Sequence, residues 1–152
     1  MMLLGAMSIA SPAAPGTLLG TAGNGGLVTG MDDYDALVIV ATLTGATGGP
    51  LDVYLQTSYD DGNHWVDYVH YAQVAAAAAA ASKFTSVSKY VQITNFPTVG
   101  FDGTPALAAA TVVGGPWGRQ MRAVLVAGAL TTAGATQVVS VLGTRASSLM
   151  RG

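Results

Sequence analysis

Two short segments with a two-residue period constrain the fold of this chain more than any other feature. Residues 51–58 read LDVYLQTS and residues 120–127 read QMRAVLVA. Because successive side chains of a β-strand point to opposite faces, the first segment places its two leucines and its valine on one side. The second separates methionine, alanine and leucine from arginine and two valines in the same way. Both segments are therefore predicted to be β-strands with one face towards a core.

Further strands are predicted at residues 35–43, 64–73, 83–95 and 137–145, with weaker candidates at 17–21 and 26–31. The first of these is a continuous apolar run, which is typical of a strand buried on both faces. The alanine-rich stretches 74–81 and 106–110 are predicted to be connections or single helical turns. Short strands with glycine-rich connections favour one all-β domain over residues 17–152. The expected fold is an antiparallel β-sandwich, jelly-roll or immunoglobulin-like, of about six to eight strands. Closure into a barrel is left open.

The first sixteen residues are apolar and end in small residues and prolines. They match a signal peptide poorly, because no Lys or Arg precedes the apolar run and Gly5 interrupts it. We expect residues 1–16 to form an extended arm that lies on a neighbouring subunit. Its predicted contact residues are Met1, Leu3, Leu4 and Ile9.

Charge is scarce in this chain. Charged residues make up 9% of the sequence and hydrophobic residues 51%, whereas an average soluble domain has about 25% charged residues. A chain with so few charges exposes uncharged surface, which is typical of interaction sites. We therefore expect a subunit of an assembly, with a homo-oligomer favoured. An ordinary monomer with a tolerant Ala/Gly-rich surface is the alternative.

Several partners and chemistries are not expected. The six Lys and Arg form no basic stripe for nucleic acid, and no run of about 18 apolar residues suits a membrane helix. No cysteine exists, and His64 and His70, on one predicted strand, lie too far apart to share a metal ion. The aspartate pairs at 32–33 and 60–61 favour turn capping over Ca²⁺ binding. We predict no catalytic residue, cofactor or metal, and no enzyme.

Residues 58–65 read SYDDGNHW and form the one sharp local motif. This S-x-D-x-G-x-x-W pattern resembles the Asp-box of sialidase-type propellers and other β proteins, where it is structural and remote from catalysis. The aspartate can accept N–H groups of a turn, the glycine permits a positive φ, and the tryptophan ring covers the turn. The motif occurs once, so it implies a hairpin corner and not a sialidase. Its residues are Ser58, Asp60, Gly62 and Trp65.

A wider pattern runs through residues 51–73, and it continues in GRQMRAV at 118–124 and the valine-rich segment 137–143. This order resembles a family of small phage virion proteins. They carry a DVYLQTS-like strand, a Gly-containing turn, a W-x-D strand, an R-x-M/V-R strand and a final valine-rich strand. The resemblance covers about half of the chain. It implies a β-sandwich with a structural role in the virion, and partners such as the major capsid protein or other virion subunits.

The expected function is that of a capsid cement or decoration protein, which stabilises the phage head by protein–protein contacts. A neck or tail component, such as an adaptor, tail-tube or minor tail subunit, is the first alternative. A carbohydrate- or receptor-binding module is the second, because aromatic side chains can form a stacking platform. Tyr54, Tyr68 and His70 are predicted to meet on one exposed patch, and Tyr54, Tyr68 and Trp117 are candidate interface residues.

Overall fold

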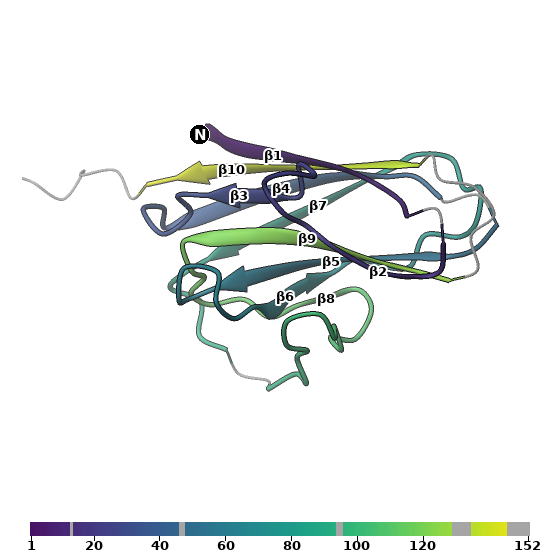
Figure 1. Cartoon of the computed structure of the whole chain (residues 1–152). Helices are drawn as coiled ribbons and strands as arrows, with labels where there is room; N and C mark the ends of the chain where they lie inside the picture. Colours follow the sequence, from purple (N-terminus) through teal and green to yellow (C-terminus); the bar gives the residue numbers. More distant parts are fainter. Residues whose placement is uncertain (13, 46–47, 94–95, 129–134, 146–152) are drawn as a thin grey trace, which may run out of the picture.

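The computed structural model describes residues 1–12, 14–45, 48–93, 96–128 and 135–145. Within these residues the chain forms ten β-strands and no helix, arranged as two antiparallel sheets packed face to face. Figure 1 shows the two layers and the connections that gather at both ends of the strands. The described residues contain no helix long and apolar enough to cross a membrane. The all-β antiparallel sandwich predicted from the sequence is confirmed.

Sheet A has the strand order β1-β10-β4-β7. Its strands are β1 (Met2–Ala10), β10 (Thr136–Thr144), β4 (Ala36–Leu43) and β7 (Ala81–Ser88). Sheet B has the order β2-β9-β5-β6-β8, and β3 also pairs with β9. Its strands are β2 (Gly16–Leu19), β9 (Gln120–Ala127), β5 (Leu51–Ser58), β6 (Val66–His70), β8 (Thr111–Val112) and β3 (Leu27–Thr29). The sheets are separate, so the sandwich does not close into a barrel.

The core lies between the sheets and uses every second residue of the central strands. Sheet A contributes Leu37, Ile39, Val139 and Val141, all fully buried, and sheet B contributes residues of β5 and β9 such as Leu55 and Leu125. Burial of each such side chain stabilises the fold by about 1.5–3 kcal/mol. The alternation predicted for 51–58 and 120–127 is thus confirmed. The side chains that point into the core are the leucines and valine of the first segment and the methionine, alanine and leucine of the second.

The predicted N-terminal arm is wrong. Residues Met2–Ala10 are a strand of this domain, paired antiparallel with β10 from Met2↔Gly143 to Ala10↔Thr136. Met7 and Ile9 are buried in the core, and a register shift between Leu3 and Gly5 breaks the alternation. The shift explains the error, because Leu3 and Leu4 look like a uniform apolar run. The alternation of Met7 and Ile9 with small residues was the available signal.

Other strand predictions need smaller corrections. Strand β4 is buried on one face only, since its residues alternate between buried and half-buried. Strand β7 ends at Ser88, so Val91 lies beyond it and not on a strand face. The alanine-rich stretches contain turns without helix, and β8, which follows the second stretch, was missed. Two-residue strands carry no periodicity, so no sequence pattern marks them.

Two buried tyrosines make a matched test of hydrogen bonding in the core. The Tyr68 hydroxyl donates to the Gly115 carbonyl oxygen at 2.9 Å, whereas the Tyr71 hydroxyl is buried without a hydrogen-bond partner among the described residues. We expect Tyr68→Phe to lower the free energy of unfolding by about 1 kcal/mol. Tyr71→Phe is expected to leave it unchanged or raise it, because it removes an unpaired polar atom. Urea unfolding measures both, and equal losses would contradict the assignment.

Candidate interaction surfaces

The hairpin between β5 and β6 is organised by the Ser58 hydroxyl and the Asp60 carboxylate. The Ser58 side chain is fully buried, and its Oγ accepts the Gly62 N–H at 2.7 Å. Asp60 Oδ1 accepts the His64 N–H at 2.8 Å, and Asp60 Oδ2 lies 2.6 Å from His64 Nδ1. Gly62 has a φ of 91°, which a side chain rarely adopts. The predicted hairpin corner therefore has the expected internal hydrogen bonds.

Trp65 completes this corner and connects it to a distant loop. Its indole Nε1 donates to the Gly62 carbonyl oxygen at 3.0 Å, as a ring folded over the turn requires. Its backbone N–H donates to Asp102 Oδ1 at 2.9 Å. The motif therefore contributes to tertiary structure as well as to the turn.

The hydrogen bonds of Asp60 change its acidity. The His64 backbone N–H, then the His64 side chain, lowers the pKa of the Asp60 carboxyl from 3.8 to about 2. The hydrogen bond to Asp60 in turn raises the pKa of His64. Because the folded pKa of Asp60 lies below its unfolded value, its contribution to stability is present above about pH 4. That contribution is lost as the pH falls towards 2. The His64 contribution is also stabilising but depends on pH in the opposite direction: it is present at low pH and is lost as the pH rises through the folded pKa of His64.

We expect an NMR titration of the Asp60 side-chain carboxyl to give a pKa of about 2. In His64→Ala this pKa is expected to rise only part of the way towards 3.8, because the larger cause is the backbone N–H, which alanine retains. A complete return to 3.8 in His64→Ala would show that the ring dominates.

A buried carboxylate on the outer face of sheet B holds a long loop in place. Asp67 is 1% exposed, and its Oδ2 accepts the backbone N–H groups of Gly100, Ala106 and Leu107 at 2.7–2.9 Å. These three residues belong to the segment 96–110, which precedes β8 and lies outside sheet B (Figure 1). One side chain thus satisfies backbone donors that an irregular loop cannot pair by itself.

Gln56 links the Asp67 carboxylate to the Arg122 guanidinium through hydrogen bonds. Gln56 Nε2 donates to Asp67 Oδ1 at 2.9 Å, and Gln56 Oε1 accepts from Arg122 Nε and Nη2 at 2.9 and 2.7 Å. Arg122 Nη2 also donates to the Asp102 carbonyl oxygen, and its guanidinium lies 4.5 Å from the Trp65 ring centroid. Burial lowers the pKa of Arg122. These groups join the hairpin, the sheet and the loop into one network.

His70 is a second attachment point for the same loop. It is 5% exposed, its Nδ1 lies 2.7 Å from the Leu107 carbonyl oxygen, and its Nε2 lies 3.1 Å from Asp52 Oδ1. Its ring stacks on Tyr54 with centroids 3.8 Å apart. Both ring nitrogens therefore have protein partners, which is the usual state of a buried imidazole.

The candidate interface residues divide into exposed and buried sets. Met1 and Leu3 are 74% and 58% exposed, and Leu4 is half-buried. The others, covered by the chain itself, are Ile9, Tyr54, Tyr68 and Trp117. The exposed aromatic patch predicted for Tyr54, Tyr68 and His70 is wrong. Tyr54 and His70 do meet, but under the loop, whereas Tyr68 belongs to the core between the sheets.

A β-bulge and a cross-chain hydrogen bond explain this burial. The register shift in β5–β6 lies between Leu55 and Gln56, opposite Tyr68, so that Tyr68 and Val69 both enter the main core. Trp117 is 3% exposed, and its Nε1 donates to the Met31 carbonyl oxygen at 2.8 Å. A two-residue period could not reveal either feature, because a bulge changes the phase and the Met31 contact is remote in sequence.

The outer face of sheet A is an extended surface without charge. By strand alternation and register, its side chains are those of Leu3, Ala6, Ser8, Ala10, Ala36, Val38, Val40, Thr42, Ser82, Phe84, Ser86, Ser88, Thr136, Val138, Ser140, Leu142 and Thr144. Each of them is exposed or half-buried, and Phe84 and Val138 are 70% and 37% exposed. Sequence reasoning missed this face, because it treated β1 as an arm and β4 as buried on both sides.

Two ion pairs between arginine and aspartate lie at one end of the sandwich. Arg119 pairs with Asp61 at 3.8 Å and Arg145 with Asp33 at 3.6 Å, both at the end where β5 and β10 finish. The stretches of sequence that join β1 to β2, β4 to β5, β6 to β7 and β9 to β10 are 11–15, 44–50, 71–80 and 128–135. Their sequences contain no Asp, Glu, Lys or Arg. Asp52, near the start of β5, and Lys83, near the start of β7, are charged residues next to these stretches.

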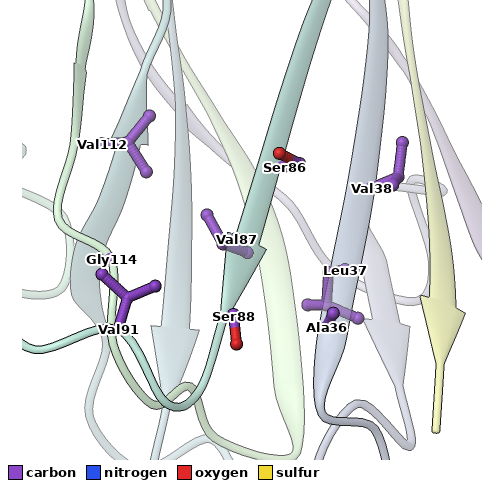
Figure 2. A pocket seen from close by; sticks show the side chains of 9 residues that line it. All are labelled: Ala36, Leu37, Val38, Ser86, Val87, Ser88, Val91, Val112 and Gly114. Atoms are coloured by element: carbon purple, nitrogen blue, oxygen red, sulfur yellow. The ribbon is translucent and has the colours of Figure 1, made fainter. Parts of the chain in front are cut away.

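A small groove lies beside β7 at the edge of the sandwich. Figure 2 shows Val112, Gly114 and Val91 on one side of β7 and residues of β4 on the other. Its volume is about 330 Å³, and the only side-chain polar groups in its lining are the hydroxyls of Ser86 and Ser88. A site for chemistry needs convergent polar or titratable groups, which this lining does not supply.

The described residues hold no group of His, Asp, Glu or Cys side chains that could bind a metal ion. The two surfaces that stand out are the uncharged outer face of sheet A and the outer face of sheet B, which is covered by a loop. No family model, curated protein or solved structure matches this chain.

Proposed function

We propose that this chain is a structural protein of a phage virion, most specifically a capsid cement or decoration protein. The observation that carries the proposal is the outer face of sheet A, which presents rows of small apolar and hydroxyl side chains without charge. Surfaces of this kind are typical of sites that other proteins cover. The partners are the major capsid protein or other virion subunits, and the location is the virion.

The resemblance to small phage virion proteins supports the same proposal. The segments that carry it form β5, β6, β9 and β10, which are paired or central strands of the two sheets. Binding by a free N-terminal arm no longer belongs to the proposal, since β1 pairs with β10. A carbohydrate-binding platform built on Tyr54 and Tyr68 does not either, since both rings are buried.

Copy number in purified particles tests the proposal. The particles of the virus that encodes the chain are separated by denaturing electrophoresis, and the band is quantified against the major capsid protein. On the order of hundreds of copies is expected for a shell component, whereas about six or twelve would indicate the neck or tail alternative. Absence of the chain from intact particles would overturn the proposal of a virion protein.

A further inference from the structure

The two sheets differ in how their outer faces are covered. The chain covers the outer face of sheet B itself, because Asp67 and His70 hold the 96–110 loop over it. Among the described strands, those of sheet A contact one another, and β1 also contacts β3 and β9. The side chains on the outer face of sheet A are exposed or half-buried. Val138 and Phe84 accordingly stay exposed on strands β10 and β7.

We propose that a second copy of this chain packs on the outer face of sheet A, so that two sandwiches associate back to back about a two-fold axis. The inference deepens the proposed function by naming the partner of that face. A two-fold interface places the same surface on both sides, so any charged patch would meet its own sign. The outer face of sheet A carries no charge, and the ion pairs lie at its end.

The size and relief of this face fit sheet-on-sheet packing. Strands about 4.8 Å apart and residues about 3.4 Å apart give four strands of about eight residues an area of about 500 Å². Two copies would bury about 1,000 Å², the lower limit for a specific interface. The central row across the sheet is Ala6, Ser140, Val40 and Phe84. Its first three side chains are small enough for two sheets to approach to about 10 Å, and the large Phe84 side chain lies at the edge, on β7.

Sedimentation velocity at concentrations from about 1 to 100 µM tests the dimer. The wild-type chain is expected to reach twice its mass of 15.2 kDa. Val138→Lys places a cation on the face of both copies and is expected to weaken association at least about 100-fold. Val112→Lys is the matched control, since Val112 is also 37% exposed on a strand but lies on β8 of sheet B. It is expected to stay dimeric.

Ser86→Lys is a second variant on the face, at an exposed position of the edge strand β7 where folding tolerates a lysine. Circular dichroism confirms that each variant is folded. A wild-type monomer at about 100 µM would overturn the dimer, as would dimers that both face variants leave intact. The chain could instead be a monomer that is found on particles and whose association with particles is abolished by Val138→Lys. In that case the face binds another virion subunit, so the dimer fails while the proposed function stands. If the chain forms the dimer but is absent from particles, the proposed function fails while the dimer stands.

Discussion

Asp67→Ala is expected to lower the free energy of unfolding by about 4 kcal/mol. The substitution leaves the N–H groups of Gly100, Ala106 and Leu107 without their acceptor at a buried site. Each buried unpaired donor costs about 1–3 kcal/mol, and partial access of water to the released loop reduces the sum. Gln56 also loses the acceptor of its amide group, which leaves Arg122 without part of its support.

Urea unfolding measures this loss, and two further variants calibrate it. Asp67→Asn keeps one oxygen acceptor but turns an amide group towards the loop or Gln56, so an intermediate loss of about 2 kcal/mol is expected. Asp33→Ala, at a carboxylate that is 71% exposed, is expected to stay within about 0.5 kcal/mol of wild type. Faster chymotrypsin cleavage at Phe101 in Asp67→Ala would show that the loop has left sheet B. A loss below about 1 kcal/mol would contradict the anchoring role.

Gly118→Ala is expected to cost at least about 3 kcal/mol or to prevent folding, because overpacking against a rigid backbone has no inexpensive relief. A Cβ at this position would lie 1.6 Å from the Ser58 carbonyl oxygen and 2.9 Å from the Tyr59 nitrogen. Here the segment before β9 crosses the start of the hairpin, and the Gly118 N–H donates to Thr57 Oγ1 at 2.9 Å. Neither backbone can move without disturbing the β5–β9 pairing at Ser58↔Gln120.

Gly23→Ala is the matched control for this prediction. The nearest atom to a Cβ at Gly23 is Thr21 Oγ1 at 3.8 Å, an ordinary contact distance. Its free energy of unfolding is expected to stay within about 1 kcal/mol of wild type. Soluble yield and urea unfolding measure both variants. Equal behaviour of the two glycine variants would mean that the chain can separate at the crossing without loss.

The Asp-box hairpin was predictable because its interactions are local. Ser58, Asp60, Gly62 and Trp65 contact one another within a few residues, so the spacing of residue types specifies the turn. The link from the Trp65 N–H to Asp102 was not predictable, because the partner is 37 residues away. The same holds for Gly118, whose requirement for glycine arises from a crossing with β5 and not from a turn.

The candidate interface was predicted less well, and the reason is the pairing of strands. Apolar composition suggested Ile9, Tyr54, Tyr68 and Trp117 as contact residues, and all four are buried in this chain. The side chains that do lie on an uncharged surface, such as Val138, Ser140 and Val40, come from strands distant in sequence. Composition correctly indicated that uncharged surface exists, but it could not place that surface.

By itself, the sequence determined the period of two in the central strands, the phase that enters the core and the hairpin corner at 58–65. Each of these depends on residues within one strand or turn. The tertiary structure decided that β1 pairs with β10, that Asp67 fastens the 96–110 loop over sheet B, and that sheet A keeps a bare outer face. These outcomes depend on which strands become neighbours, and hydrogen-bond pairing between distant segments is set by the packing of the whole sandwich.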